Sequence, residues 1–199
     1  MDYAITIELI RHAKTKSNVE RKYLGWTDES IIPNQSLPTI DELATVVFGS
    51  DLIRCKETAA YYFPNATYMN IKGLRESHFG DFECKTYEQL KDIQVYRNWI
   101  DDPYEIAPPN GETLQQVMFR VTEVVKSLPK DMLNYRIVAH GGSIRALLMQ
   151  FAPEEKTFWE WQVSHNERYL LHWSTKKQFE EGQRCTFLSV EPIMVKGTM

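Results

Sequence analysis

Three short apolar segments constrain the fold of this chain most strongly. Residues 5–10, 45–49 and 136–139 are rich in β-branched side chains and are bounded by polar residues or glycine. Such segments are typical of strands in a parallel sheet that helices cover on both faces. Helical segments lie between them, so the order is broadly strand–helix–strand–helix. The sequence therefore predicts an α/β fold, a three-layer α/β/α sandwich around a mostly parallel central sheet.

Apolar residues at helical spacing indicate the helices. The clearest run occupies residues 112–128, and Pro129 follows it. Further helices are expected at 50–62, 87–99 and 143–151. Two more strands are expected near the carboxyl terminus, at 169–173 and 187–190.

Composition limits the class of protein and its partners. The chain has 199 residues, a formal net charge of −4 and no basic stripe, so we expect a single domain over 1–199 that does not bind nucleic acid. No run approaches the roughly 20 apolar residues that cross a bilayer, and the first residues do not resemble a signal peptide. Three scattered cysteines predict reduced thiols and a cytoplasmic location. Nothing in the sequence indicates an oligomeric state.

Side chains suited to binding phosphate follow each of the three buried strands. Arg11 and His12 follow the first strand, a helix bearing Arg54 follows the second, and His140 and Gly141 follow the third. Because the carboxyl ends of parallel strands meet at one edge of a sheet, these groups should converge. The helix after His140 would add backbone N–H donors. The sequence predicts a compact site for a dianion such as phosphate.

A phosphate site that also transfers the phosphoryl group needs a proton donor. The polar loop at residues 74–83 offers Glu76, Asp81 and Glu83, with Gly80 as a hinge. Composition alone does not choose among the three acids.

Taken in chain order, these motifs resemble those of the histidine phosphatase superfamily, whose fold is shared with the cofactor-dependent phosphoglycerate mutases. The resemblance extends from Ile5 to about Leu148, roughly three quarters of the chain. The matching elements are Arg11-His12-Ala13, Asn18, Arg54 within residues 50–59, Glu76, Gly111-Glu112-Thr113 and His140-Gly141-Gly142.

The resemblance implies a phosphomonoester hydrolase that needs no metal or other cofactor. Neutral His12 would attack phosphorus to give a phosphohistidine, which water would then hydrolyse. Glu76 would protonate the leaving alcohol and later deprotonate the water. For His12 to attack, its other ring nitrogen should donate to a backbone carbonyl.

The resemblance also implies the groups that bind the small phosphate ester. The phosphoryl oxygens would be held mainly by cationic and N–H donors, and positioning with charge stabilisation would supply most of the catalysis. The expected substrate-binding residues are Arg11, Asn18, Arg54, His140, Gly141 and, bordering the pocket, Arg21.

The chain departs from the family pattern at a few positions. Ala13 stands where glycine is usual, and a positive φ there would cost roughly 1 kcal/mol or more. Lys14 replaces a frequent glutamate, and the first helix, between residues 33 and 46, looks abbreviated. Whether these changes affect activity does not follow from the sequence. Residues 23–28 and 158–163 look like the α-ribazole phosphatase branch, which makes α-ribazole 5′-phosphate one candidate substrate.

Several other functions and roles stay open. The mutases carry an arginine where Ser77 stands, together with an inserted loop that is missing here, so hydrolysis is favoured over phosphoglycerate mutation. A non-catalytic sensor of phosphorylated ligands would usually lose the nucleophile or the donor, and a phosphoprotein phosphatase is a third alternative. His78 is interpreted as a rim or packing residue, and His165 and His172 as structural residues. A set of aromatic residues is interpreted as core and sheet edge, with a substrate-lining role open for one of them: Trp159, Trp161, Tyr169 and Trp173.

Overall fold

The computed structural model describes residues 3–193 and contains a six-stranded sheet with the order β3-β2-β4-β1-β5-β6. The pairs β1–β4, β4–β2 and β2–β3 are parallel, whereas β5 runs antiparallel to both β1 and β6. The predicted α/β fold with a mostly parallel sheet is confirmed. The strands are β1 (Ile5–Arg11), β2 (Val46–Gly49), β3 (Thr67–Asn70), β4 (Asn134–Ala139), β5 (Glu167–Trp173) and β6 (Phe187–Pro192).

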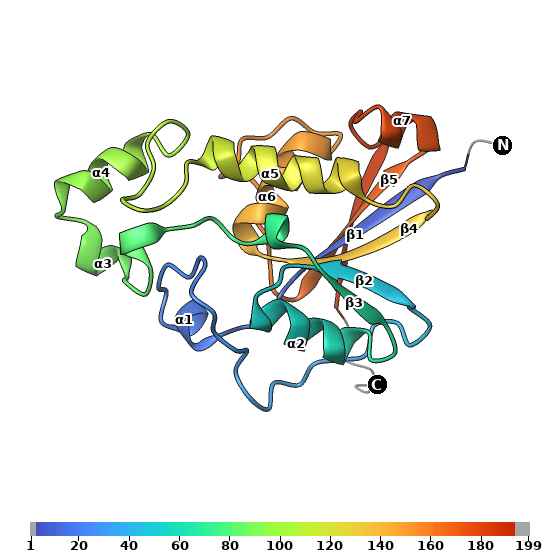
Figure 1. The fold of residues 1–199 in the computed structure, drawn as a ribbon, viewed down its shortest axis with the longest axis horizontal. Helices are drawn as coiled ribbons and strands as arrows, with labels where there is room; N and C mark the ends of the chain where they lie inside the picture. Colours follow the sequence, from blue (N-terminus) through green and yellow to red (C-terminus); the bar gives the residue numbers. More distant parts are fainter. Residues whose placement is uncertain (1–2, 194–199) are drawn as a thin grey trace.

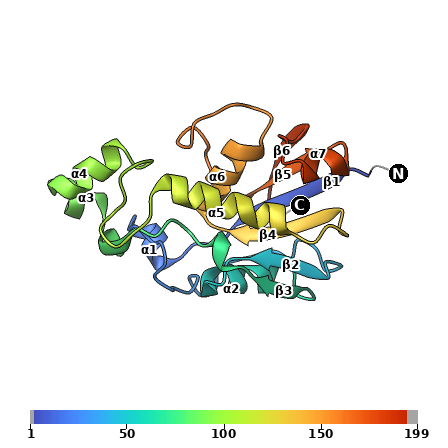
Figure 2. The ribbon, with the colours of Figure 1, turned by 45° about the horizontal axis from the view of Figure 1, so that its top comes forward.

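Helices cover both faces of the sheet. Helices α5 and α6 lie over one face and α2 lies over the other, while α3 and α4 project beyond the sheet (Figures 1 and 2). Two 3₁₀ turns, at Lys72–Leu74 and Gly80–Phe82, flank the loop that carries Glu76. The α-helices are α1 (Lys16–Val19), α2 (Ile53–Tyr62), α3 (Tyr87–Leu90), α4 (Gln94–Asp101), α5 (Leu114–Ser127), α6 (Gly141–Phe151) and α7 (Lys176–Glu180).

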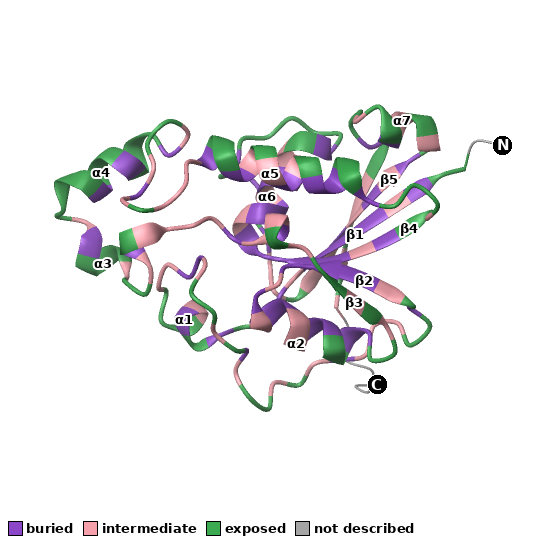
Figure 3. Cartoon of the chain, viewed as in Figure 1, coloured by how far each residue is buried: buried purple, intermediate pink, exposed green. Residues whose placement is uncertain are grey.

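The central strand β1 shows why both faces are covered. Ile7 and Leu9 point into the core beneath α5 and α6, whereas Ile10 packs with Cys55 and Ala59 of α2 on the opposite face. Since successive side chains of a strand point to opposite faces, a run that is apolar at consecutive positions must be buried on both sides. The buried residues accordingly concentrate along the central strands (Figure 3).

The prediction of one helix over residues 87–99 is wrong, because the structure divides this segment into α3 and α4. Leu90 and Trp99 belong to one buried cluster with Tyr96 and Phe82. In a continuous helix, nine residues make about two and a half turns, which would put Leu90 and Trp99 on opposite faces. The break after Leu90 lets both side chains reach the same core.

Other segments also differ from the sequence prediction: helix α2 begins at Ile53 rather than at residue 50, and α6 begins at Gly141 rather than at residue 143. Helix α5 begins at Leu114, because the Thr113 side chain caps it by accepting the Gln116 N–H, and Glu112 is left outside the helix. The abbreviated helix expected between residues 33 and 46 is absent, and that segment is an irregular connection.

Candidate active site

His12 lies directly after β1 and is almost fully buried, with 3% of its surface exposed. Its Nδ1 lies 2.7 Å from the carbonyl oxygen of Ala13, so the expected hydrogen bond is present and this nitrogen must carry the proton. Burial lowers the pKa of His12 well below its ordinary value, and the cations Arg54 and Arg11 lower it further. The ring is therefore neutral at physiological pH, with its lone pair on Nε2.

The backbone around His12 is held from two sides. The Ala13 N–H donates to Thr58 Oγ1 at 2.8 Å, and the Thr58 hydroxyl donates to the Arg54 carbonyl at 2.6 Å. His165 Nδ1 donates to the His12 carbonyl at 2.6 Å. Ala13 does not have a positive φ, so the replacement of glycine causes no backbone strain. The interpretation of His165 as a packing or rim residue does not reveal this contact with His12, because no local sequence pattern marks it.

Arg54 and Arg11 bring two guanidinium groups to His12. Arg54 is fully buried and donates to His140 Nδ1 at 3.2 Å and to the carbonyls of Gly25 and Thr27 at 2.6 and 2.9 Å. A guanidinium has five N–H donors, so two of those on Arg54 stay available. Arg11 Nη1 donates to a backbone carbonyl, while its buried Nε has no partner among the described residues.

His140 stands at the amino terminus of α6, with its ring centroid 5.1 Å from that of His12. Because Nδ1 accepts the Arg54 N–H, the ring proton lies on Nε2, 3.5 Å from Cys55 Sγ. Sulfur is a weak acceptor, so this N–H is the donor that the ring can offer an anion. Burial lowers the pKa of His140 well below its ordinary value and raises the pKa of the Cys55 thiol to about 12, so both groups are neutral.

Glu76 lies against the first turn of α6. One carboxylate oxygen accepts the Gly142 N–H at 2.9 Å and the other accepts the Ser77 N–H at 2.8 Å. A Cβ atom on Gly142 would lie 2.1 Å from Glu76 Oε1, so only glycine leaves room for the carboxylate there. The Gly141 N–H, one of the free donors at the start of α6, has no hydrogen-bond partner among the described residues and adjoins Arg11.

The other two acids of this loop are engaged elsewhere. Asp81 accepts a hydrogen bond from Asn110, and Glu83 accepts the backbone N–H groups of Trp26 and Thr27. Of the three acids, Glu76 alone is among the residues that line the cavity beside Arg11. The geometry thus separates three acids that the composition of the loop left equivalent, and it singles out the same acid as the family resemblance.

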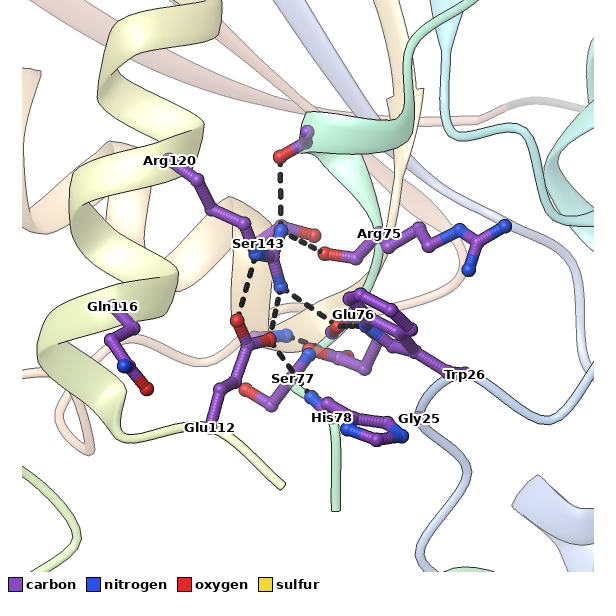
Figure 4. A network of polar contacts seen from close by, with 12 residues as sticks. Gly25, Trp26, Arg75, Glu76, Ser77, His78, Glu112, Gln116, Arg120 and Ser143 are labelled. Atoms are coloured by element: carbon purple, nitrogen blue, oxygen red, sulfur yellow. Dashed lines mark hydrogen bonds and ion pairs between the residues drawn. The ribbon is translucent and has the colours of Figure 1, made fainter. Parts of the chain in front are cut away.

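A network around Arg120 of α5 holds the Glu76 loop (Figure 4). All five N–H donors of Arg120 are used: two bond the Glu112 carboxylate, and three bond the carbonyls of Gly73, Arg75 and Glu76. Glu112 also accepts the N–H of His78 at 2.9 Å. The Arg120–Glu112 pair therefore fixes the backbone on both sides of Glu76. The sequence motif Gly111-Glu112-Thr113 includes Glu112, but it does not reveal that Arg120 is its partner.

Beside Arg11 and Glu76 lies a cavity of about 460 Å³ with apolar walls. Trp159 lines it, whereas Trp161 and His78 are not among its lining residues; Trp161 is buried, and His78 lies against Trp26. Asn18 and Arg21 instead line a second cavity that also includes Arg11. The walls of the first, the apolar cavity, are formed mainly by Tyr23, Phe79, Trp99, Ile100, Leu114, Phe158 and Trp159.

Two further observations concern the described residues 3–193 only. No group of three or more His, Cys, Asp or Glu side chains is placed to hold a metal ion. No helix in this part of the chain is long and apolar enough to span a membrane.

Comparison with known proteins assigns the family. Residues 7–183 match the histidine phosphatase superfamily (branch 1), so the chain belongs to that superfamily. Members of the superfamily act on phosphate esters. This bears out the resemblance that the motifs indicate.

The individual relatives share less than a third of their aligned residues with this chain. A 2,3-bisphosphoglycerate-dependent phosphoglycerate mutase of Methylobacterium radiotolerans is 28% identical over 161 residues, covering 71% of this chain and 76% of the mutase. Phosphoglycerate mutase-like protein 4 of Arabidopsis thaliana is also 28% identical, over 78% of this chain and 74% of its own. The crystal structure of the α-ribazole phosphatase from Shigella flexneri superimposes with a TM-score of 0.78 at 24% identity, over 95% of this chain and 96% of that one. At this identity the structural likeness shows the fold.

Proposed function

We propose that residues 1–199 form one catalytic domain that hydrolyses phosphomonoesters through a phosphohistidine on His12. The observation that carries this proposal is the state of His12: buried, neutral, and bonded through Nδ1 to a carbonyl, so that Nε2 is free to attack. Arg11 and Arg54 retain N–H donors for the phosphoryl oxygens. Donors fixed in advance around a transferring phosphoryl group are the main source of catalysis in such reactions.

The reaction takes two displacements. In the first, His12 Nε2 forms a bond to phosphorus while the bond to the alcohol oxygen breaks, and the Glu76 carboxyl gives that oxygen a proton. In the second, Glu76 accepts a proton from water, the water oxygen attacks phosphorus, and the bond to Nε2 breaks. Inorganic phosphate leaves, and His12 and Glu76 return to their starting states.

The apolar cavity defines the kind of ester that fits. Its walls include Trp99, Phe158 and Trp159, which suit a planar or apolar alcohol portion, with Glu76 beside the ester oxygen. The fold shared with the Shigella flexneri α-ribazole phosphatase makes α-ribazole 5′-phosphate the first specific substrate to test.

One observation favours a second candidate, phosphoglycerate mutation. Arg145 lines the apolar cavity, where its Nε donates to the Trp161 carbonyl at 2.9 Å. The guanidinium of Arg145 could pair with the carboxylate of phosphoglycerate, which the hydroxyl of Ser77 cannot do. A coupled assay for conversion of 3-phosphoglycerate to 2-phosphoglycerate distinguishes the two activities, and we expect hydrolysis to exceed mutation.

The direct test is release of phosphate from p-nitrophenyl phosphate in EDTA, comparing the native protein with His12→Ala. We expect turnover that survives EDTA and is lost in the variant. Turnover that is retained by a folded His12→Ala protein would reject His12 as the nucleophile.

A further inference from the structure

A second cavity, of about 690 Å³, adjoins the candidate active site and is rich in cations. We call it the basic groove. It shares Arg11 and Tyr23 with the apolar cavity, so a molecule whose phosphoryl group lies against Arg11 is in reach of both. The residues that line it are Arg11, Lys14, Asn18, Val19, Arg21, Lys22, Tyr23, Tyr87 and His165.

The positive charge of the basic groove is only partly neutralised. None of its lining residues is a carboxylate, and among its cations Lys22 pairs with Glu20, at 2.7 Å. The side chains of Lys14 and Arg21 have no hydrogen-bond or ion-pair partner among residues 3–193. In a chain whose formal net charge is −4, this is a local concentration of positive charge. A concave surface lined by one sign of charge attracts ions of the other sign.

Arg21 occupies a backbone position that does not favour it. Its φ is +55°, just past the end of α1, where glycine or asparagine is the usual residue. Hydrogen bonds from the Arg21 and Lys22 N–H groups to the carbonyls of Asn18 and Ser17, at 3.3 and 2.9 Å, hold this conformation. The turn thus places a long cation on the groove at a conformational cost, which an adventitious surface charge does not explain.

The donors nearest the nucleophile extend the same surface. Asn18 Oδ1 accepts the Thr15 N–H, which leaves the Asn18 amide N–H groups free to donate. Arg11 presents a buried Nε without a partner in the described part of the chain. The same cavity is therefore lined by anion-binding groups that include Arg11, Asn18 and Arg21.

We propose that the basic groove binds a second anionic group, a phosphate or a carboxylate, on the same small molecule whose phosphoryl group reaches His12. The inference rests on the proposed function and narrows its substrate class to phosphomonoesters that carry a further negative charge. Lys14 and Arg21 are then residues that determine specificity rather than catalytic residues.

Binding of phosphonates tests the groove separately from catalysis, because their carbon–phosphorus bond is not hydrolysed. The probes are alkylphosphonates and the matching α,ω-bisphosphonates with about two to six carbons, since two linked groups bind best when the linker matches the span of the sites. A parallel series of ω-carboxyalkylphosphonates distinguishes a second phosphate from a carboxylate. Dissociation constants are measured by calorimetry at low and high salt.

We expect at least one doubly charged probe to bind about tenfold more tightly than its monophosphonate. This gain in affinity is what two partly screened ion pairs, between the second charge of the probe and Lys14 and Arg21, should supply. The double variant Lys14→Ala/Arg21→Ala should lose most of this advantage, because its affinity for the doubly charged probe should fall much more than its affinity for the monophosphonate. The control Lys126→Ala/Lys177→Ala makes the same change in net charge at exposed sites outside the groove and should keep the advantage. High salt should reduce the advantage in the native protein.

Each alternative result is decisive. If monophosphonates bind and no second charge improves affinity, or if both double variants lose the advantage equally, the basic groove proposal is wrong while the hydrolase proposal stands. If neither class of probe binds, the phosphate site itself is absent and the proposed function fails with it.

Discussion

The proposed nucleophile side of the candidate active site and its proposed proton-donor side are held in place by different kinds of structure. His12 and His140 directly follow the parallel strands β1 and β4, and Arg54 opens the helix that follows β2. Glu76, in contrast, lies in a loop between two 3₁₀ turns, and it is fixed by the Arg120 side chain of α5 and by the start of α6. Sheet geometry places the first group, and hydrogen bonds between distant segments place the second.

This difference has a mechanistic meaning. The nucleophile must keep one ring nitrogen unprotonated, which requires a buried and rigid environment. The donor has to exchange a proton with an alcohol and then with water, so it belongs at the edge of a cavity. Variants on the nucleophile side should therefore slow the hydrolysis of all esters. Variants on the donor side should slow the hydrolysis of esters with poor leaving groups more than that of esters with good ones.

Apart from the loss of His12 itself, the largest effect on turnover is expected from Arg54→Lys, on the nucleophile side. Lysine cannot reproduce the planar donor set that bonds His140, Gly25 and Thr27. Removing a fixed donor from a charged transition state lowers kcat by about 10²–10³-fold, and we expect that loss for alkyl and nitrophenyl phosphates alike. Steady-state kinetics on both esters measure it. A loss confined to the alkyl ester would assign Arg54 to the donor side instead.

Gly142→Ala should break the donor side by steric conflict. The new Cβ would lie 2.1 Å from Glu76 Oε1 and would displace the carboxylate. We expect kcat for an alkyl phosphate to fall about 10²-fold, the usual contribution of a general acid, with a much smaller loss for p-nitrophenyl phosphate.

Gly141→Ala is the matched control for that variant. Its Cβ would approach Arg11 Cζ at 3.2 Å, and its three nearest atoms all belong to Arg11 rather than to Glu76. Its loss should be smaller and similar for the two esters. If both glycine variants showed the same dependence on the leaving group, the carboxylate would not be the donor.

Arg120→Gln should loosen the donor side without touching the substrate. It removes most of the hydrogen bonds to Glu112 and to the carbonyls before Ser77. Loss of one partner from a largely buried ion pair should lower the free energy of unfolding by about 3 kcal/mol. We expect about a tenfold loss of kcat for the alkyl ester and less for p-nitrophenyl phosphate.

Chemical denaturation and kinetics on the two esters test this positioning role. Lys126→Gln, an exposed change on the same helix, serves as the control and should alter neither quantity. Destabilisation of Arg120→Gln with an unchanged ratio of the two rates would make the network purely structural.

The smallest effect is the dependence of stability on pH. His12, His140 and His165 all have folded-state pKa values below the ordinary 6.5, and that of His165 falls to about 4 because of burial and Arg11. Below pH 6.5 the unfolded chain therefore binds more protons than the folded one, so stability is full above pH 6.5 and is lost as the pH falls. Melting temperatures from pH 7.5 to 5 should show this decline. His165→Asn should make the decline shallower; an unchanged slope would mean that folding does not lower the pKa of His165.

The sequence predicts the nucleophile side better than the donor side for a physical reason. Strand ends are marked locally, so Arg11, His12 and His140 could be placed at one edge before the structure was known. The composition of the loop at residues 74–83 does not distinguish Glu76 from Asp81, because the difference depends on hydrogen bonds to distant residues; only the family resemblance singles out Glu76.

The same limit explains the other differences. The break between α3 and α4 follows from tertiary packing of Trp99 with Leu90, which overrides helical periodicity. His165 and Arg120 were not assigned to the site because each contacts it through backbone carbonyls, far away in the chain.

The most direct test of the account uses Glu76→Gln with p-nitrophenyl phosphate. The first displacement needs little help from an acid with this leaving group, while the second needs Glu76 as the base, so the phosphohistidine should accumulate. We expect a burst of about one equivalent of nitrophenol per chain, with the phosphoryl group located on the His12 peptide by mass spectrometry at alkaline pH. His12→Ala in the same background should abolish both signals. A burst with the phosphoryl group on another residue, or slow linear release with no labelled peptide, would contradict the division of roles between His12 and Glu76.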